Sequence, residues 1–174
     1  MVWVYVLKSK DGTFEPFKTL IENKKCMKIK IIRTDNGLEF CNKEFAQMCK
    51  ENDILMHLTV PGNPKQNGLA ERMNRTLLER VRCMLIHARL SKLFCGEVVT
   101  IVVYVINRSP SATIGFKTPY EIWNSHKPIL EHLRIFGCIA YTHVKKEKLE
   151  PRAKRCLFIG YPTGVKGYKL WDLE

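Results

Sequence analysis

Residues 31–40 read IIRTDNGLEF, and this stretch decides how the first half of the chain is interpreted. Two isoleucines are typical of the end of a β-strand, and the following Asp35, Asn36 and Gly37 form a common turn sequence. On its own, the aspartate of such a turn only accepts hydrogen bonds from the turn backbone. The alternative, that Asp35 belongs to a catalytic set, needs a second carboxylate at a suitable place in the chain.

The segments around this stretch alternate between β and α patterns. β-Branched and aromatic residues predict strands over residues 2–7, 29–33 and 54–60. Apolar side chains at helical spacing predict helices over residues 14–21 and 44–51. Strands that alternate with helices predict an α/β layer architecture.

A long helix is predicted from residue 66 onward, because apolar residues recur there every three or four positions with arginines between them. Four polar residues share its opposite side: Asn67, Glu71, Asn74 and Arg75. They form either an ordinary solvated face or part of a site. Glu71 lies at the start of this helix, with 35 residues between it and Asp35. A strand-end aspartate and a helix-start glutamate can converge on one metal ion.

The second half of the chain contains a different pattern of predicted elements. The run VVTIVVYVI (residues 98–106) is interpreted as a buried helix, although its β-branched residues leave a strand open. Thr118 and Pro119 predict a capped helix start. Three short aromatic segments, RIFGCIAYTHV, CLFIGYP and GYKLWDL, predict strands of a small β-barrel.

Composition restricts the classes of function. A net charge of +12 suits a polyanion such as DNA or RNA, but also an anionic membrane or an acidic protein. The seven cysteines are odd in number and contain no Cys-x-x-Cys pair, which argues against a zinc knuckle and against a disulfide scaffold. The longest apolar run falls far short of the roughly 20 residues of a membrane helix. We therefore expect a soluble protein without a membrane partner.

Longer stretches carry a family resemblance. RTDNGLEFCNKEF, LTVPGNPKQNGLAERMNRTLLERVRCML, INRSPS, KTPYEIW, LRIFGCIAY and LEPRAKRCLFIGY occur in this order and span nearly the whole chain. The sequence resembles the integrase core of copia-type retrotransposon polyproteins, followed by their small Src-homology-3-like barrel. The resemblance implies a ribonuclease H-like fold in which three acids, Asp, Asp and Glu, bind two divalent metal ions. In that set Asp35 would be the second acid and Glu71 the third.

The resemblance also implies chemistry and partners. The metal would be Mg²⁺ or Mn²⁺, and the reaction would be DNA integration, in which a 3′ hydroxyl of the element attacks target DNA. Five residues would contact that DNA: Lys65, Gln66, Asn67, Asn74 and Arg75. The expected partners are the element ends and the target DNA, and a homo-oligomer is left open. The expected location is the nucleus.

In the family, the first of the three catalytic acids and two strands precede the sequence that matches residues 2–11. We therefore expect an α/β, ribonuclease H-like core that is truncated at its N-terminus and lacks the first two strands of the family fold. The predicted domains are a partial catalytic core at 1–110, a connecting helix and linker at 111–130, and the small barrel at 131–174. The expected function is that of an integrase fragment that is inactive alone. The alternatives are a non-catalytic nucleic-acid-binding module and a transposon remnant.

Overall fold

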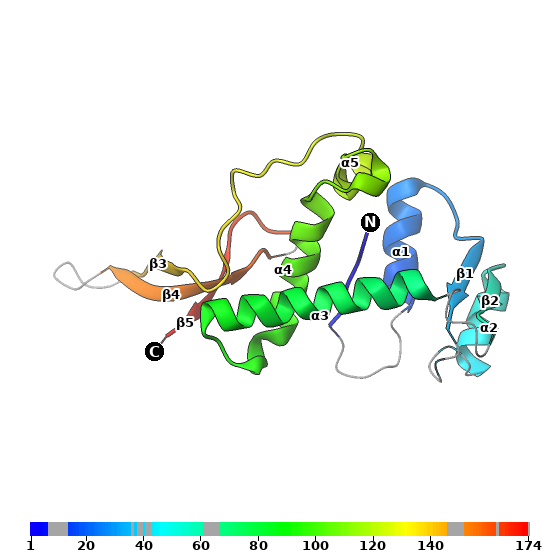
Figure 1. The fold of residues 1–174 in the computed structure, drawn as a ribbon, viewed down its shortest axis with the longest axis horizontal. Helices are drawn as coiled ribbons and strands as arrows, with labels where there is room; N and C mark the ends of the chain where they lie inside the picture. Colours follow the sequence, from blue (N-terminus) through cyan, green and yellow to red (C-terminus); the bar gives the residue numbers. More distant parts are fainter. Residues whose placement is uncertain are drawn as a thin grey trace. The chain divides into compact units, whose positions relative to one another are not determined.

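The computed structural model describes residues 1–6, 14–35, 37, 40, 43–60, 67–145, 152–162 and 164–173. The chain is mixed α/β and forms two compact units (Figure 1). One unit is Tyr5–Asn74, and the other combines Met1–Val4 with Arg75–Glu174. The three predicted domains do not correspond to these units, and their boundaries stay a prediction.

The unit Tyr5–Asn74 is built on a parallel pair of strands. Its elements are α1 (Phe14–Lys25), β1 (Ile31–Thr34), α2 (Lys43–Glu51), β2 (Leu55–Leu58) and the first turns of α3 (Gly68–Ala88). β1 and β2 run parallel, with Ile31 opposite Leu55. The helices and strands predicted between residues 14 and 60 are thus confirmed, each with slightly shifted ends.

A small apolar core holds this unit together. Phe45 and Cys49 lie one turn apart on the inner face of α2, and both are buried together with Ile54. Phe45 also makes edge-to-face contacts with Phe14 of α1 and with Phe40. This core positions the end of β1, where Asp35 lies.

Residues 2–6 do not form the predicted strand, and Leu7 lies outside the described residues. The main chain of Val2 instead pairs with the side-chain amide of the buried Asn107. The Val2 N–H donates to Asn107 Oδ1 at 2.9 Å, and Asn107 Nδ2 donates to the Val2 carbonyl at 2.7 Å. Trp3 packs edge-on against Trp123, with ring centroids 5.0 Å apart. The prediction was wrong because a strand requires a neighbouring backbone, whereas this segment is held by side chains.

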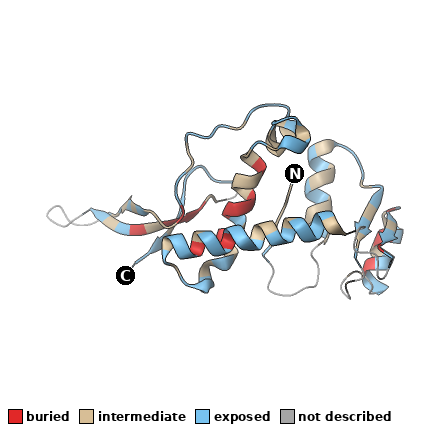
Figure 2. Ribbon diagram, viewed as in Figure 1, coloured by how far each residue is buried: buried red, intermediate tan, exposed pale blue. Residues whose placement is uncertain are grey.

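The larger unit is centred on α4 (Cys95–Arg108), which is the helix expected from VVTIVVYVI. Val98, Ile101 and Val102 are almost fully buried, because the core surrounds this helix on several sides. Figure 2 shows buried positions on α3, α4 and β4. Short elements flank α4: η2 (Lys92–Phe94), η3 (Ala112–Ile114) and α5 (Pro119–Asn124).

A three-stranded antiparallel sheet in the order β3-β4-β5 completes this unit. Its strands are β3 (Ile139–His143), β4 (Ala153–Gly160) and β5 (Lys169–Asp172), which confirms the three predicted strands. Phe158 and Ile159 of the central strand are buried and join the core around α4. The described part of the predicted barrel is this sheet.

No single helix in the described part of the chain is both long and apolar enough to cross a membrane. The bent pair Lys92–Arg108 and Ala112–Asn124 reaches that threshold jointly, by length and composition only.

Candidate active site

Asp35 is exposed and directly follows β1. Its Oδ1 accepts a hydrogen bond of 3.2 Å from the Gly37 N–H. This is the local side-chain-to-backbone bond expected of an aspartate that opens a turn. Turn formation therefore occupies one oxygen of the carboxylate.

The other oxygen of Asp35 is near the start of α3. Asn67 Nδ2 donates to Asp35 Oδ2 over a long 3.4 Å. The Asn67 carbonyl in turn accepts the Glu71 N–H at 3.1 Å, so Glu71 lies one helical turn beyond Asn67. Asn67 therefore links the Asp35 carboxylate to the backbone of the first turn of α3, which carries Glu71.

The donor set suits a hard cation. Mg²⁺ and Mn²⁺ prefer carboxylate oxygens, and Mg²⁺ is commonly held by one or two carboxylates while water and substrate phosphates fill its other positions. A carboxylate offers about four acceptor directions, so two hydrogen bonds to Asp35 leave room for a cation. Within the described ranges, no group of three or more His, Cys, Asp or Glu side chains could hold a metal ion. Asp35 and Glu71 each offer carboxylate oxygens, the type of ligand that such a cation prefers.

The remaining sequence-predicted site residues are spread along and before α3. Asn74 and Arg75 are exposed on that helix. Arg75 is the first α3 residue of the larger unit, and Asn74 is the last residue of the smaller one. Lys65 and Gln66 lie outside the described residues.

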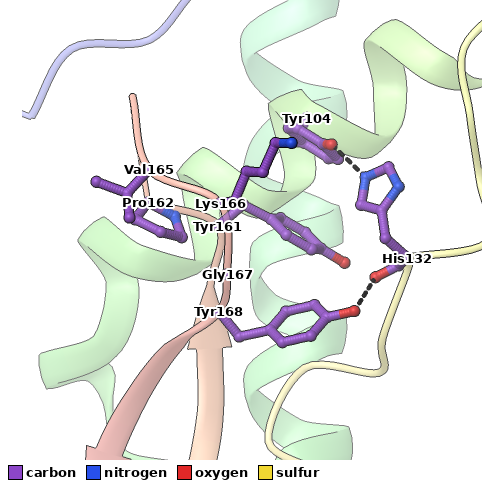
Figure 3. Close-up of a pocket in the computed structure, with 8 residues that line it drawn as sticks. All are labelled: Tyr104, His132, Tyr161, Pro162, Val165, Lys166, Gly167 and Tyr168. Carbon is purple, nitrogen blue, oxygen red and sulfur yellow. Dashed lines mark hydrogen bonds between the residues drawn. The ribbon is translucent and has the colours of Figure 1, made fainter.

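The larger unit contains a pocket of about 400 Å³ that the sequence patterns did not reveal. Figure 3 shows its lining residues, including Tyr104, His132, Tyr161 and Tyr168. They come from α4, from the segment before β3 and from the β4–β5 connection. The sequence signal for this pocket is a Gly-Tyr pair at the end of β4 and another before β5. Both pairs were interpreted only as parts of predicted strands.

Comparison with known proteins agrees with this architecture. A family model described as the retroviral polymerase SH3-like domain matches residues 138–174. A chain in the cryo-EM structure of the simian T-cell lymphotropic virus intasome in complex with PP2A regulatory subunit B56 gamma matches with a TM-score of 0.51 and 20% identity. That match covers 92% of this chain and 62% of that chain. The chain is therefore a mixed α/β protein with an integrase-like fold.

Sequence relatives give the family. The Retrovirus-related Pol polyprotein from transposon TNT 1-94 of Nicotiana tabacum is 45% identical over 98% of this chain and 13% of that protein. The corresponding polyprotein from transposon RE2 of Arabidopsis thaliana is 32% identical over 95% of this chain and 12% of that protein. The chain belongs to the family of copia-like retrovirus-related Pol polyproteins. It spans about an eighth of the length of these two relatives.

Proposed function

We propose that this chain is the part of a retrotransposon integrase that brings Asp35 and Glu71 to DNA. The observation that supports this most directly is the contact between Asp35 and Asn67, because it joins the end of β1 to the helix turn that precedes Glu71. This contact is additional to the local turn bond with Gly37, because Asn67 directly precedes α3 in a separate part of the sequence. Asn67 is here a positioning residue that orients the Asp35 carboxylate.

In this proposal the carboxylates of Asp35 and Glu71 hold Mg²⁺ or Mn²⁺. Divalent metal held by these residues would supply activation of the attacking oxygen and stabilisation of the leaving oxygen of the phosphodiester. The side chains of Lys65, Gln66, Asn74 and Arg75 contact the phosphates or bases of the element ends and the target. The net charge of +12 favours such binding through the release of counterions from DNA.

Metal binding tests the site directly. We expect Mn²⁺ binding, followed by water-proton relaxation, to weaken in Asp35→Asn and Glu71→Gln, because each loses a carboxylate ligand. Asn67→Ala should weaken it by about tenfold, as is typical when a partner that orients a ligand is removed. Glu79→Gln, an exposed position on the same helix, is the matched control and should bind as the parent does. Equal affinity in all four variants would refute the assignment.

We further propose that a polypeptide of these 174 residues does not join DNA ends alone, because Asp35 and Glu71 are two acids of a set of three in the family it resembles. The test is incubation with end-labelled duplex and Mg²⁺ or Mn²⁺. Joining that is present in the parent and lost in Glu71→Gln would disprove this inactivity while supporting the site itself.

A non-catalytic nucleic-acid-binding role is the second candidate, and the strongly basic composition favours it. Duplex binding measured by fluorescence anisotropy at several salt concentrations tests this role. Arg75→Ala should reduce the slope of log affinity against log salt by about 0.9, the value expected when the protein neutralises one phosphate fewer. An absence of binding at low salt would eliminate both candidates.

The proposed DNA substrate also suggests where and in what form the protein acts. We infer a nuclear location and self-association on the element ends. Microscopy of a fluorescent fusion tests the location. Sedimentation with and without an end-mimicking duplex tests self-association, and an unchanged monomer in both samples would refute it.

A further inference from the structure

We propose that the pocket between α4 and the β4–β5 connection binds an unpaired nucleobase of the DNA. This inference rests on the proposed nucleic-acid function and adds to it a specific binding site. The pocket lies entirely within the larger unit. Its volume of about 400 Å³ is at the lower end of the range of small-ligand sites, roughly 300 to 1,000 Å³.

Two tyrosines form a fixed wall of this pocket. The rings of Tyr104 and Tyr161 stack at 4.4 Å with 22° between their planes. The Tyr104 hydroxyl is hydrogen-bonded to His132 Nε2 at 2.5 Å, and the Tyr161 hydroxyl accepts the Arg134 N–H at 2.9 Å. Burial raises the pKa of both phenols, so they are neutral near pH 7. With their hydroxyls already bonded, these rings contribute an apolar surface.

Tyr168 is the ring that remains accessible. It is 41% exposed, and its hydroxyl donates to the His132 carbonyl at 3.1 Å, which fixes the ring in place. Figure 3 shows Tyr161 between Tyr104 and Tyr168, in agreement with ring-centroid distances of 4.4 and 6.1 Å. An aromatic ring held in one orientation and open to solvent is a platform on which a flat ligand can stack.

The charge around the pocket selects the kind of ligand. Lys166 lines it, and the described lining residues include no acidic side chain. The guanidinium of Arg108 lies 3.4 Å from the Tyr104 ring centroid, and that of Arg134 lies 5.6 Å from the Tyr168 centroid. These cations oppose the binding of a further cation, such as a methylated lysine, that aromatic cages otherwise accept. A base with its phosphate meets both requirements, since it is flat and anionic.

The base must be unpaired to enter. A base inside a duplex is stacked on both faces, and a pocket that stacks an aromatic ring on the base reaches it only after the base has left the stack. A single-stranded stretch needs no such step, and stacking on an aromatic side chain tolerates any base. We therefore expect the pocket to prefer single-stranded DNA without a strong sequence preference.

The test compares two single-stranded oligonucleotides of equal length and charge, one normal and one abasic at every position. Fluorescence anisotropy with the full chain should give tighter binding to the normal oligonucleotide. Equal affinity for the two would overturn the pocket proposal while leaving nucleic-acid binding intact. Loss of binding to both oligonucleotides and to duplex at low salt would instead refute the proposed function.

Substitution of Tyr168 tests whether base stacking occurs in this pocket. Tyr168→Leu should reduce affinity for the normal oligonucleotide by about 5- to 150-fold, the range for one base that no longer stacks, and should leave the abasic one unaffected. Tyr168→Phe retains the stacking ring but loses its bond to the His132 carbonyl, so its loss of affinity should be smaller than that of Tyr168→Leu. Tyr141→Leu is the matched control, because Tyr141 is 68% exposed on β3 and does not line the pocket. Equal losses in Tyr168→Leu and Tyr141→Leu would contradict the proposal.

Lys166→Gln provides a second test that does not depend on the tyrosine core. It should reduce the salt slope for single-stranded DNA by about 0.7. An unchanged slope would oppose a role for Lys166 at the phosphate. A trimethyl-lysine peptide that binds, and loses affinity in Tyr168→Leu, would overturn the nucleotide assignment.

Discussion

Asn107 is a buried amide near the C-terminal end of α4. It is 4% exposed, and its donor and its acceptor are both bonded to the main chain of Val2. A buried amide with both groups bonded is stable, whereas the same group without partners destabilises the fold. The side chain thus supplies Val2 with the pair of hydrogen bonds that a neighbouring strand would otherwise provide.

We expect Asn107→Ala to lower the free energy of unfolding by about 1–3 kcal/mol, because both Val2 groups lose their partner. Urea denaturation measures the loss, and hydrogen exchange should show faster exchange at the Val2 amide. Asn124→Ala is the control, since Asn124 Nδ2 makes one local bond to the Tyr120 carbonyl. Equal losses in the two variants would show that the link to Val2 contributes nothing specific.

Gly137 permits a close approach of two segments in the larger unit. Its φ is +77°, its N–H donates to the Phe158 carbonyl at 2.9 Å, and an added Cβ would lie 2.6 Å from Ala88 Cβ. We expect Gly137→Ala to destabilise the fold by about 2–4 kcal/mol, from backbone strain plus overpacking. Gly164→Ala is the control because Gly164 has a similar φ of +75° with open space around it. Gly164→Ala should lower the free energy of unfolding by about 1–2 kcal/mol in thermal unfolding, because it adds backbone strain without overpacking.

At the scale of the element, α5 is a six-residue helix that depends on its first turn. The Thr118 hydroxyl accepts the Glu121 N–H at 3.0 Å, and Pro119 occupies the first helical position. Thr118→Ala should lower stability by about 1 kcal/mol in urea denaturation, as is usual when an N-cap is removed. Thr100→Ala is the contrast, because the Thr100 hydroxyl only donates to the Glu97 carbonyl within α4. It should be neutral or slightly stabilising, and a larger loss there than at Thr118 would contradict the capping argument.

Most helices and strands could be predicted from the sequence because their signals are local. The cap before α5 and the apolar periodicity of α3 each lie within a single window. The β-branched run of α4 was compatible with a strand as well as a helix. Packing on several sides in the core favours the helix. The unpaired segment at residues 2–6 could not be predicted, because its partner is a side chain 105 residues away.

The candidate site was predictable to a similar degree. The turn role of Asp35 follows from its neighbours, and Glu71 was placed in the first turn of its helix. The bond from Asn67 to Asp35 depends on how loops bring distant segments together, so no local pattern contains it. The tyrosine pocket is likewise built from separate stretches, and each tyrosine alone looks like an ordinary core or strand residue.

At the scale of the whole molecule, the two units have cores of different size. Among the described residues, the core of the unit Tyr5–Asn74 has three buried apolar residues: Phe45, Cys49 and Ile54. Counted in the same way, the core cluster of the larger unit has eight, from α3, α4, the segment before β3, and β4. Because stability rises with the buried apolar surface, the smaller unit should open more readily.

We therefore expect amides of β1, β2 and α2 to exchange at a lower opening free energy than those of α4 and β4. Native-state hydrogen exchange in increasing urea measures both. Phe45→Ala should accelerate exchange in the smaller unit alone, and Phe158→Ala should do so in the larger one. A single opening free energy throughout the chain, changed equally by both variants, would show one cooperative unit instead.

The smaller unit is nested in the sequence of the larger one, since residues 5–74 separate Val4 from Arg75. This arrangement affects the order of events during synthesis. At about 5–20 residues per second, a ribosome needs roughly 5–20 s to add the chain between Val2 and Asn107. The elements of the smaller unit leave the ribosome during that interval, whereas residues 1–4 wait for their partner. Residues 1–4 can therefore be fixed only after all residues of the smaller unit have been synthesised.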